Sequence, residues 1–168
     1  MNILKLIVLQ CFWFGSIKYG QNLFLPLSGL LLFIFDFLTF RKTENLKISY
    51  LAFSFILVIS GIAMDKVINY LNILEWGDRF YPTELIGVWL IFPCYYYYFF
   101  KKFQKPKWLP FLIGAIFGPL AYYSGANISS NIMLSEYTLN IILLGSIWGT
   151  FFWFSNLLYL YFEKRARK

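Results

Sequence analysis

Residues 48–64, ISYLAFSFILVISGIAM, present apolar side chains on every helical face and end directly before Asp65. An α-helix of this length rises about 25 Å, close to the roughly 30 Å hydrocarbon core of a bilayer. A membrane-spanning strand would instead alternate apolar and polar residues with a period of two. The stretch therefore predicts a transmembrane helix.

Five further apolar runs flank this one, separated by charged or turn-rich segments. The chain has 168 residues, of which 60% are hydrophobic, 23% aromatic and only 14% charged, and its mean hydropathy is +0.61. Soluble domains carry about a quarter charged residues, so these charges could not coat a globule that buries six such runs. We expect an all-α fold, an integral membrane bundle of six transmembrane helices in one domain covering residues 1–168. The expected helices lie at about 3–18, 23–40, 48–66, 84–100, 108–124 and 138–162.

The distribution of lysine and arginine predicts the orientation. With a cytoplasmic N-terminus, twelve of the fifteen cations lie on the inner side, and an even number of helices returns the C-terminus to the cytoplasm. Only Lys18, Lys66 and Arg79 then lie outside. The basic clusters are short and sit at helix ends, which favours contact with anionic lipid over nucleic acid. We therefore expect the bilayer, and no nucleic acid, as a partner.

Residue types that carry common chemistry are scarce. The sequence has no histidine, and Cys11 and Cys94 both lie inside apolar runs without metal-ligand spacing. Phosphate-binding glycine loops and nucleophile motifs are also missing from the sequence. We expect no catalytic constellation, no metal site and no cofactor.

Asp65 is the most informative polar residue because an ionisable group in a membrane span costs at least about 2.5–3.5 kcal/mol. If the third helix continues beyond its apolar run, Gly61, Asp65, Asn69 and Asn72 share one face. Two interpretations remain open. The stripe is either an interfacial helix end that meets water or one wall of an outward-facing polar pocket.

The fifth predicted helix carries a matching face. Gly114, Gly118, Tyr122 and Gly125 follow one another at helical spacing, and Gly114-x-x-x-Gly118 is typical of close helix packing. Pro119 should kink or open this helix, because proline lacks a backbone donor. This face, which ends near Asn127, could form the second wall of a pocket on the same outer side as Asp65.

Two further polar residues require partners within the bilayer. Gln10 lies in the middle of the first helix, and interhelical hydrogen bonding is its expected role. Asp36 lies near the inner end of the second helix. Pairing with Arg41, Lys42 or Lys5 is its expected role, and a proton relay is the alternative.

An ordered series of motifs resembles a bacterial family of small multi-pass membrane proteins, domain of unknown function 2878. The series consists of LQCFWF at 9–14, Gly61-x-x-x-Asp65, Pro82 ahead of VWLIF at 88–92, and GAIFGPLAYYSGA at 114–126. The matching positions are Gln10, Trp13, Asp65, Trp89, Gly118, Pro119, Tyr122 and Gly125. The inner half of the fourth helix departs from the family, which has small and polar residues where this chain has Cys94 and four tyrosines.

The resemblance implies a multi-pass protein of the bacterial inner membrane, linked to membrane lipid metabolism or envelope stress. With Trp89 added, the candidate ligand-binding residues are Asp65, Asn69, Trp89, Tyr122 and Asn127. The candidate helix-packing residues are Gln10, Trp13, Gly61, Gly114, Gly118, Pro119 and Gly125.

The sequence is consistent with three functions. The first is a non-enzymatic accessory or scaffold protein that contacts a membrane protein partner or a second copy of itself. The second is a small-solute or lipid binding or transport protein with a polar pocket near Asp65. The third is an intramembrane enzyme acting on lipid, with Asp65 as general base beside Tyr122 or Tyr123.

Overall fold

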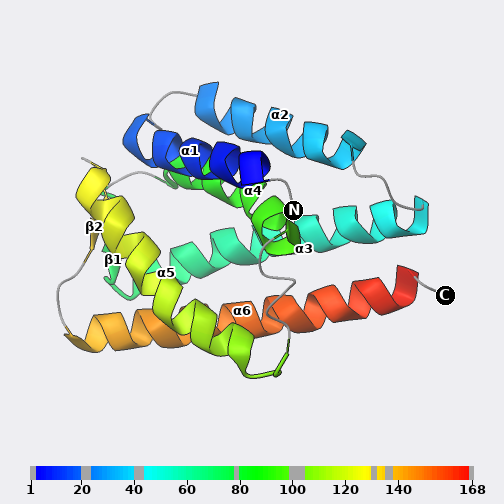
Figure 1. The fold of residues 1–168 in the computed structure, drawn as a ribbon. Coiled ribbons are helices and arrows are strands. Elements are labelled where there is room, and N and C mark those ends of the chain that lie inside the picture. Colours follow the sequence, from blue (N-terminus) through cyan, green and yellow to red (C-terminus); the bar gives the residue numbers. More distant parts are fainter. Residues whose placement is uncertain are drawn as a thin grey trace.

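The computed structural model describes residues 3–19, 24–39, 44–77, 80–98, 105–129, 132–134 and 138–166. Within these ranges the chain forms six helices and two very short strands (Figure 1). The elements are α1 (Ile3–Tyr19), α2 (Phe24–Thr39), α3 (Glu44–Tyr70), β1 (Leu74–Glu75), α4 (Thr83–Tyr98), α5 (Leu109–Ile128), β2 (Met133–Leu134) and α6 (Thr138–Ala166). The predicted helical class is confirmed, and the two strands were not predicted.

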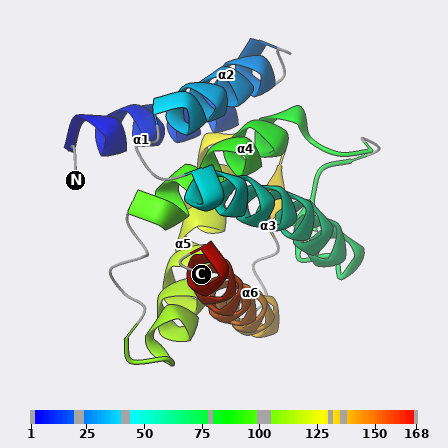
Figure 2. The same cartoon turned by 90° about the vertical axis from the view of Figure 1, so that its right-hand side faces the viewer.

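Successive helices reverse direction along the bundle. Figure 1 shows α1, α3 and α5 running one way and α2, α4 and α6 the other. The helices α3 and α6 lie side by side and antiparallel in both ribbon views, and α5 packs along α6 (Figure 2). This alternation brings the ends of α1, α3 and α5 together with the two strands at one end of the molecule.

The central element is α4, which contacts α1, α2 and α3. None of its described side chains, residues 83–96, is an exposed large hydrophobic residue, whereas each of the other five helices carries several. On α2, for example, Leu31, Phe35 and Leu38 are each at least 65% exposed. A water-soluble protein rarely exposes so much contiguous apolar surface, so the outer helix faces are suited to hydrocarbon.

Among the described residues, three helical segments are long and apolar enough to span a membrane, namely Lys47–Tyr70, Leu109–Ile128 and Thr138–Arg165. The remaining helices are shorter, with 17 residues in α1 and 16 in each of α2 and α4. A perpendicular span needs about 20 residues. The membrane class predicted from the sequence is therefore supported by α3, α5 and α6.

The end of α3 lies beyond the predicted residue 66. The helix continues to Tyr70 and closes with a Schellman motif, in which Asn72 adopts φ +54°. The Asn72 amide donates to the Asn69 carbonyl (2.9 Å) and the Ile73 amide donates to the Ile68 carbonyl (3.1 Å). Asn72, the last residue of the predicted polar stripe, is therefore the left-handed cap of the helix. The helices α5 and α6 likewise run past their predicted ends, to Ile128 and Ala166.

A two-stranded antiparallel ladder ties the α3–α4 connection to the α5–α6 connection. Leu74 pairs with Leu134, and Glu75 pairs with Met133. The Asn69 side chain donates to the Leu74 carbonyl (2.7 Å) and anchors β1 to the end of α3. The ladder therefore holds the loop that leads into α4 against the end of the bundle.

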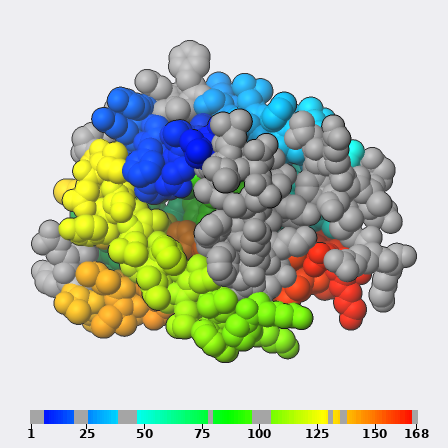
Figure 3. Space-filling view, in the orientation of Figure 1, coloured from blue at the N-terminus to red at the C-terminus, as the bar shows by residue number. Residues whose placement is uncertain are grey.

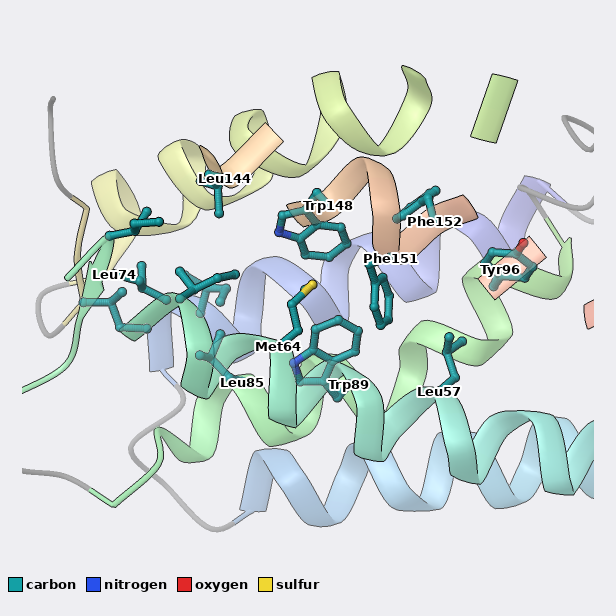
Figure 4. Packing of buried hydrophobic residues seen from close by; sticks show 14 of the residues in the cluster. Leu57, Met64, Leu74, Leu85, Trp89, Tyr96, Leu144, Trp148, Phe151 and Phe152 are labelled. Atoms are coloured by element: carbon teal, nitrogen blue, oxygen red, sulfur yellow. The ribbon is translucent and has the colours of Figure 1, made fainter. Parts of the chain in front are cut away.

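The core between α3, α4 and α6 is aromatic (Figure 4). The indoles of Trp89 and Trp148 stack with ring centroids 5.8 Å apart and an interplanar angle of 12°. Phe92, Phe151 and Phe152 surround this pair with edge-on or tilted contacts. The two stacked indoles therefore link α4 directly to α6.

Glycines allow the helices to approach these rings. A Cβ added at Gly61 would lie 2.2 Å from the Trp89 ring, and one at Gly118 would lie 2.2 Å from the Trp148 ring. On α6, Gly149 lies against Phe111 of α5, where an added Cβ would come within 2.9 Å. The α5–α6 contact thus has closely packed glycines on both helices, as in small-xxx-small interfaces.

Candidate functional site

Asp65 lies in the last two turns of α3 and is fully buried. Its Oδ2 atom accepts a hydrogen bond from the Trp89 indole N–H (2.6 Å) and another from the Tyr81 hydroxyl. Its Oδ1 atom accepts from the Tyr122 hydroxyl. Three donors from three different segments of the chain therefore converge on one carboxylate.

The local sequence explains how these donors reach Asp65. Gly61 lies one helical turn before the carboxylate, and its missing Cβ lets the Trp89 ring lie flat against α3. Tyr81 comes from the loop held by the β1–β2 ladder and meets Trp76 edge-on, with centroids 5.6 Å apart. Burial and the nearby Asp65 carboxylate raise the pKa of Tyr81 well above its ordinary value, so this hydroxyl keeps its proton and stays a donor.

The surroundings of Asp65 provide neutral donors and no cation within the described residues. The adjacent Lys66 extends away, with its Nζ atom 3.4 Å from the centroid of the Phe80 ring. A buried carboxylate is costly unless it is hydrogen-bonded. Asp65 is therefore a hub whose hydrogen bonds join α3, α4, α5 and the α3–α4 loop.

A cavity of about 360 Å³ lies beside this hub. Its walls come mainly from α1, α4 and α5, and Trp148 and Phe152 of α6 also line it. Most lining side chains are apolar or aromatic, and the described lining residues include no lysine or arginine. Of the predicted polar stripe on α3, Asp65 lines this cavity and Asn69 and Asn72 do not, and the wall that faces α5 comes mainly from α1 and α4.

The mouth of the cavity lies between α1 and α5. In Figure 3 the surface is hollowed between the blue atoms of α1 and the yellow-green atoms of α5. Phe14 on α1 and Phe117 and Leu120 on α5 line the cavity and are each at least 45% exposed. An apolar molecule could therefore enter sideways between two helices.

The sequence matches the family described as "Protein of unknown function (DUF2878)" over residues 2–154. The chain belongs to this family. No curated protein and no solved structure matches the chain. The DUF2878 match confirms the resemblance drawn from the motifs above.

The positions that carried the resemblance to DUF2878 gather around one feature. All of them except Pro119 line the cavity or its Asp65 hub. Pro119 lies on the opposite side of α5, with its Cγ atom 3.6 Å from the place of a Cβ on Gly145, and α5 continues through it as a helix. The residues of the resemblance that line the cavity are Gln10, Trp13, Asp65, Trp89, Gly118, Tyr122 and Gly125.

Three of the five candidate ligand-binding residues come together, namely Asp65, Trp89 and Tyr122. Asn69 instead anchors β1, and Asn127 is exposed and donates to the Tyr123 carbonyl one turn earlier (2.8 Å). Neither asparagine lines the cavity. Both amides satisfy backbone carbonyls near helix ends, a local role that helical periodicity does not distinguish from a binding role.

The glycines among the candidate packing residues divide into two groups. Gly61, Gly114 and Gly118 are in close contact with aromatic rings or backbone of a neighbouring helix, as expected for packing positions. Gly125 has only Ile17 nearby, at 3.9 Å from an added Cβ. Gln10 links α1 to α4, because its Oε1 atom accepts from the Tyr95 hydroxyl (3.2 Å).

Sequence reasoning missed Tyr81 and Trp148. Tyr81 lies in a loop, where no periodicity assigns it to a face, and its position directly before Pro82 was the only local signal. Trp148 sits between the glycines Gly145 and Gly149, a second small-xxx-small pair that marks this face of α6 as an interface.

A second buried acid lies toward the opposite end of the bundle. Asp36 accepts a hydrogen bond from the Tyr50 hydroxyl (3.1 Å), and this hydroxyl also contacts Cys94 Sγ at 3.6 Å. The predicted partners Arg41 and Lys42 lie outside the described residues, as does the side chain of Lys5. The cluster joins α2, α3 and α4 and has no cavity of its own among the pockets described.

Proposed function

We propose that the protein is a six-span integral membrane protein of the bacterial inner membrane, with both termini in the cytoplasm. The alternating helix directions support this topology (Figure 1). Eight lysines and arginines lie at described positions. Six of them lie toward the proposed cytoplasmic end of the bundle, and Lys18 and Lys66 lie toward the outer end. The six are Lys5, Lys47, Lys105, Lys107, Lys164 and Arg165. The other seven cations of the sequence, including Arg79, lie outside the described residues.

We propose further that the protein binds a lipid-like molecule in the cavity between α1, α4 and α5. The observation that carries this proposal is an apolar cavity that opens between two helices and ends at a buried polar hub. Its volume lies at the lower end of the roughly 300–1,000 Å³ of small-molecule sites. It would hold a head group and the first part of a chain, while the rest of the chain extends into the bilayer.

Binding fits this geometry better than catalysis does. The pairing of Asp65 with Tyr122 that an enzyme would need is present, but the hydroxyl donates to the carboxylate. Two further donors also point at this carboxylate, which is fully buried. Asp65 is therefore held as a hydrogen-bond acceptor that shapes the end of the cavity.

Photolabelling tests the binding proposal directly. The full chain in lipid nanodiscs is exposed to a hexadecyl probe with a diazirine on its chain, and the labelled peptides are identified by mass spectrometry. We expect adducts on the α1 and α5 residues of the mouth, including Phe14 and Phe117.

Labelling of a variant whose cavity is filled by a larger side chain is then compared with labelling of the wild type. Ala121 is half-buried and lines the cavity, so Ala121→Phe should occupy the space and reduce specific labelling at least several-fold. The matched control is Ala63→Phe on an exposed face of α3, which should leave labelling unchanged. Equal labelling of wild type and Ala121→Phe, with both folded by gel filtration and thermal unfolding, would contradict the proposal.

A second proposal keeps the accessory or scaffold role, linked to membrane lipid metabolism or envelope stress. Ser146 and Thr150 are exposed one turn apart on α6, and each bonds to the helix's own carbonyls. Such small residues permit close approach of another helix. Crosslinking of Thr150→Cys in membranes should then trap a membrane protein or a second copy of the chain, and a consistently uncrosslinked monomer would count against this role.

A further inference from the structure

Two side chains on one face of α1 carry hydrogen-bond donors that have no acceptor among the described residues. Gln10 and Trp13 are three residues apart, so they are neighbours on the helix surface, and both line the cavity. The Gln10 Oε1 atom accepts from the Tyr95 hydroxyl (3.2 Å), and the N–H groups of the same amide are not engaged. The Trp13 indole N–H likewise has no acceptor within the described part of the chain.

A molecule in the cavity can reach both side chains. Gln10 is exposed, and Trp13 is half-buried, with a nitrogen that is not one of the buried polar atoms without a partner. Asp65, in contrast, is fully buried and already accepts from three donors. The hydroxyl groups of the described lining residues already donate, namely those of Tyr95, Tyr122 and Ser124. The α1 face therefore offers accessible donors that an acceptor on a ligand could use.

The depth of these donors restricts the ligand. Gln10 lies in the middle of α1 (Ile3–Tyr19), with about 10–14 Å of helix on either side. In the proposed topology both donors therefore lie within the hydrocarbon core, where an unpaired polar group is costly. The phosphate of a phospholipid stays outside this core, which is about 30 Å thick. The acceptor must therefore belong to a molecule whose polar group can leave the membrane surface.

Charge restricts the acceptor further. The described lining residues include the Asp65 carboxylate and no lysine or arginine. A second carboxylate or a phosphate would bring negative charge into this low-dielectric region without a cation to balance it. An uncharged carbonyl oxygen avoids this cost, and its two lone pairs can accept from two N–H groups at once.

We propose that Gln10 and Trp13 bind the carbonyl oxygen of an uncharged lipid, such as a long-chain ester or ketone, by hydrogen bonds from the Gln10 amide and the Trp13 indole. This inference rests on the proposed binding function and specifies its ligand class and the residues that select it. The Tyr95 hydroxyl holds the amide oxygen of Gln10 and leaves the N–H groups for the ligand. The chain of the ligand leaves past Phe117 and Leu120 toward the bilayer.

The test compares competitors that share a long alkyl chain and differ in the polar group. Hexadecane, methyl palmitate, palmitate and hexadecylammonium, at equal mole fraction in the nanodisc bilayer, compete with the hexadecyl diazirine probe for the full chain. We expect methyl palmitate to compete most strongly, and the two charged competitors to be no better than hexadecane. Stronger competition by palmitate or hexadecylammonium than by methyl palmitate would overturn the inference.

Removal of either donor should weaken the ester selectively. Gln10→Met keeps the length of the side chain without its N–H groups, and benzothienylalanine in place of Trp13 keeps the ring shape without the N–H. Each change should reduce competition by methyl palmitate about 3- to 10-fold, the usual effect of one hydrogen bond, and leave competition by hexadecane unchanged. The matched control is the same replacement of Trp153, which is 45% exposed and lies outside the cavity lining.

Tyr95→Phe separates ligand binding from helix contact. This variant removes the hydrogen bond between α1 and α4 and keeps the N–H groups of Gln10. We expect it to retain the advantage of methyl palmitate over hexadecane. Loss of this advantage in Tyr95→Phe to the same extent as in Gln10→Met would assign Gln10 to interhelical contact and overturn the inference.

The outcomes separate this inference from the binding proposal. If methyl palmitate competes no better than hexadecane, or if its advantage survives in either the Gln10 or the Trp13 variant, the ligand-class inference fails while chain binding stands. If Ala121→Phe leaves labelling by the hexadecyl probe unchanged, the binding proposal itself fails. The carbonyl stretch of bound ¹³C-labelled methyl palmitate should lie at lower wavenumber in the wild type than in both variants, and an equal wavenumber would contradict the inference.

Discussion

Loss of the Asp65 carboxylate should destabilise the bundle strongly. In Asp65→Ala the N–H of the buried Trp89 and the hydroxyl of the half-buried Tyr122 lose their acceptor, at about 1–3 kcal/mol each. Tyr81 lies in the loop before α4 and not on a helix, so its hydroxyl can turn away more easily and we expect its contribution to be smaller. We expect a loss of about 2–6 kcal/mol in the free energy of unfolding.

Asp65→Asn should have a milder effect. The remaining carbonyl oxygen can accept from Trp89 and Tyr81, and the new amide can donate to the Tyr122 oxygen after this hydroxyl rotates. We expect about 1–2 kcal/mol of destabilisation, the cost of one rearranged hydrogen bond and of a lost charge-assisted interaction. The free energy of unfolding should therefore decrease in the order wild type, Asp65→Asn, Asp65→Ala, because fewer donors keep an acceptor at each step.

A double-mutant cycle isolates the contact between Asp65 and Tyr122. Tyr122→Phe alone should cost about 1.5–3 kcal/mol, the usual range for a hydrogen bond to a charged group. In the Asp65→Ala background the same substitution should cost nothing or stabilise the protein, because it removes an unpaired hydroxyl. The coupling energy should therefore be about 1.5–3 kcal/mol. The matched control is Tyr123→Phe, since Tyr123 is 61% exposed.

Unfolding in mixed dodecyl maltoside and dodecyl sulfate micelles, followed by tryptophan emission, measures these differences. If Asp65→Ala unfolded within about 0.5 kcal/mol of wild type, the ordinary effect of a surface substitution, the Asp65 hub would not stabilise the bundle as described. Strict additivity of Asp65→Ala and Tyr122→Phe would refute the direct contact.

Three further predictions concern packing, the β1 anchor and topology. Gly118→Ala should destabilise the protein by about 1–3 kcal/mol, because the new methyl would lie 2.2 Å from the Trp148 ring. Gly125→Ala should be nearly neutral, because its added Cβ would have no atom closer than 3.9 Å. Equal thermal stability of the two variants would contradict this prediction. Asn69→Ala should lower the free energy of unfolding by about 0.5–1.5 kcal/mol and leave labelling by the hexadecyl probe unchanged, because the Asn69 amide donates to the Leu74 carbonyl. Lost labelling with unchanged stability would instead place Asn69 in the binding site. In spheroplasts, an impermeant thiol reagent should label Lys18→Cys and not Lys107→Cys relative to the unsubstituted chain, and the reverse pattern would invert the topology.

The helices could be predicted from the sequence because apolar runs and charged breaks act locally. The end of α3 was harder, since residues 65–70 combine polar and apolar side chains and only the backbone of Asn72 marks the cap. The strands β1 and β2 have two residues each, and their pairing depends on the tertiary structure that brings two loops together. Patterns this short carry no periodic signal.

The site was predicted in part for the same reason. Asp65 was identifiable because a carboxylate in a hydrocarbon span demands a partner, and Tyr122 because it shares a face with Gly118. The local hydrogen bonds of Asn69 and Asn127 could not be predicted, since helical spacing gives the face of a side chain and not its hydrogen-bond partner. Trp148 was missed because an indole within an aromatic run is indistinguishable from core until the cavity that it lines is seen.

A density map of the protein purified in native lipid, without added ligand, tests the proposed binding site most directly. We expect elongated non-protein density that enters between α1 and α5 and ends beside the Asp65 hub. A cavity closed by direct contact of α1 with α5, or one that holds only water next to Asp65, would contradict a lipid-binding role.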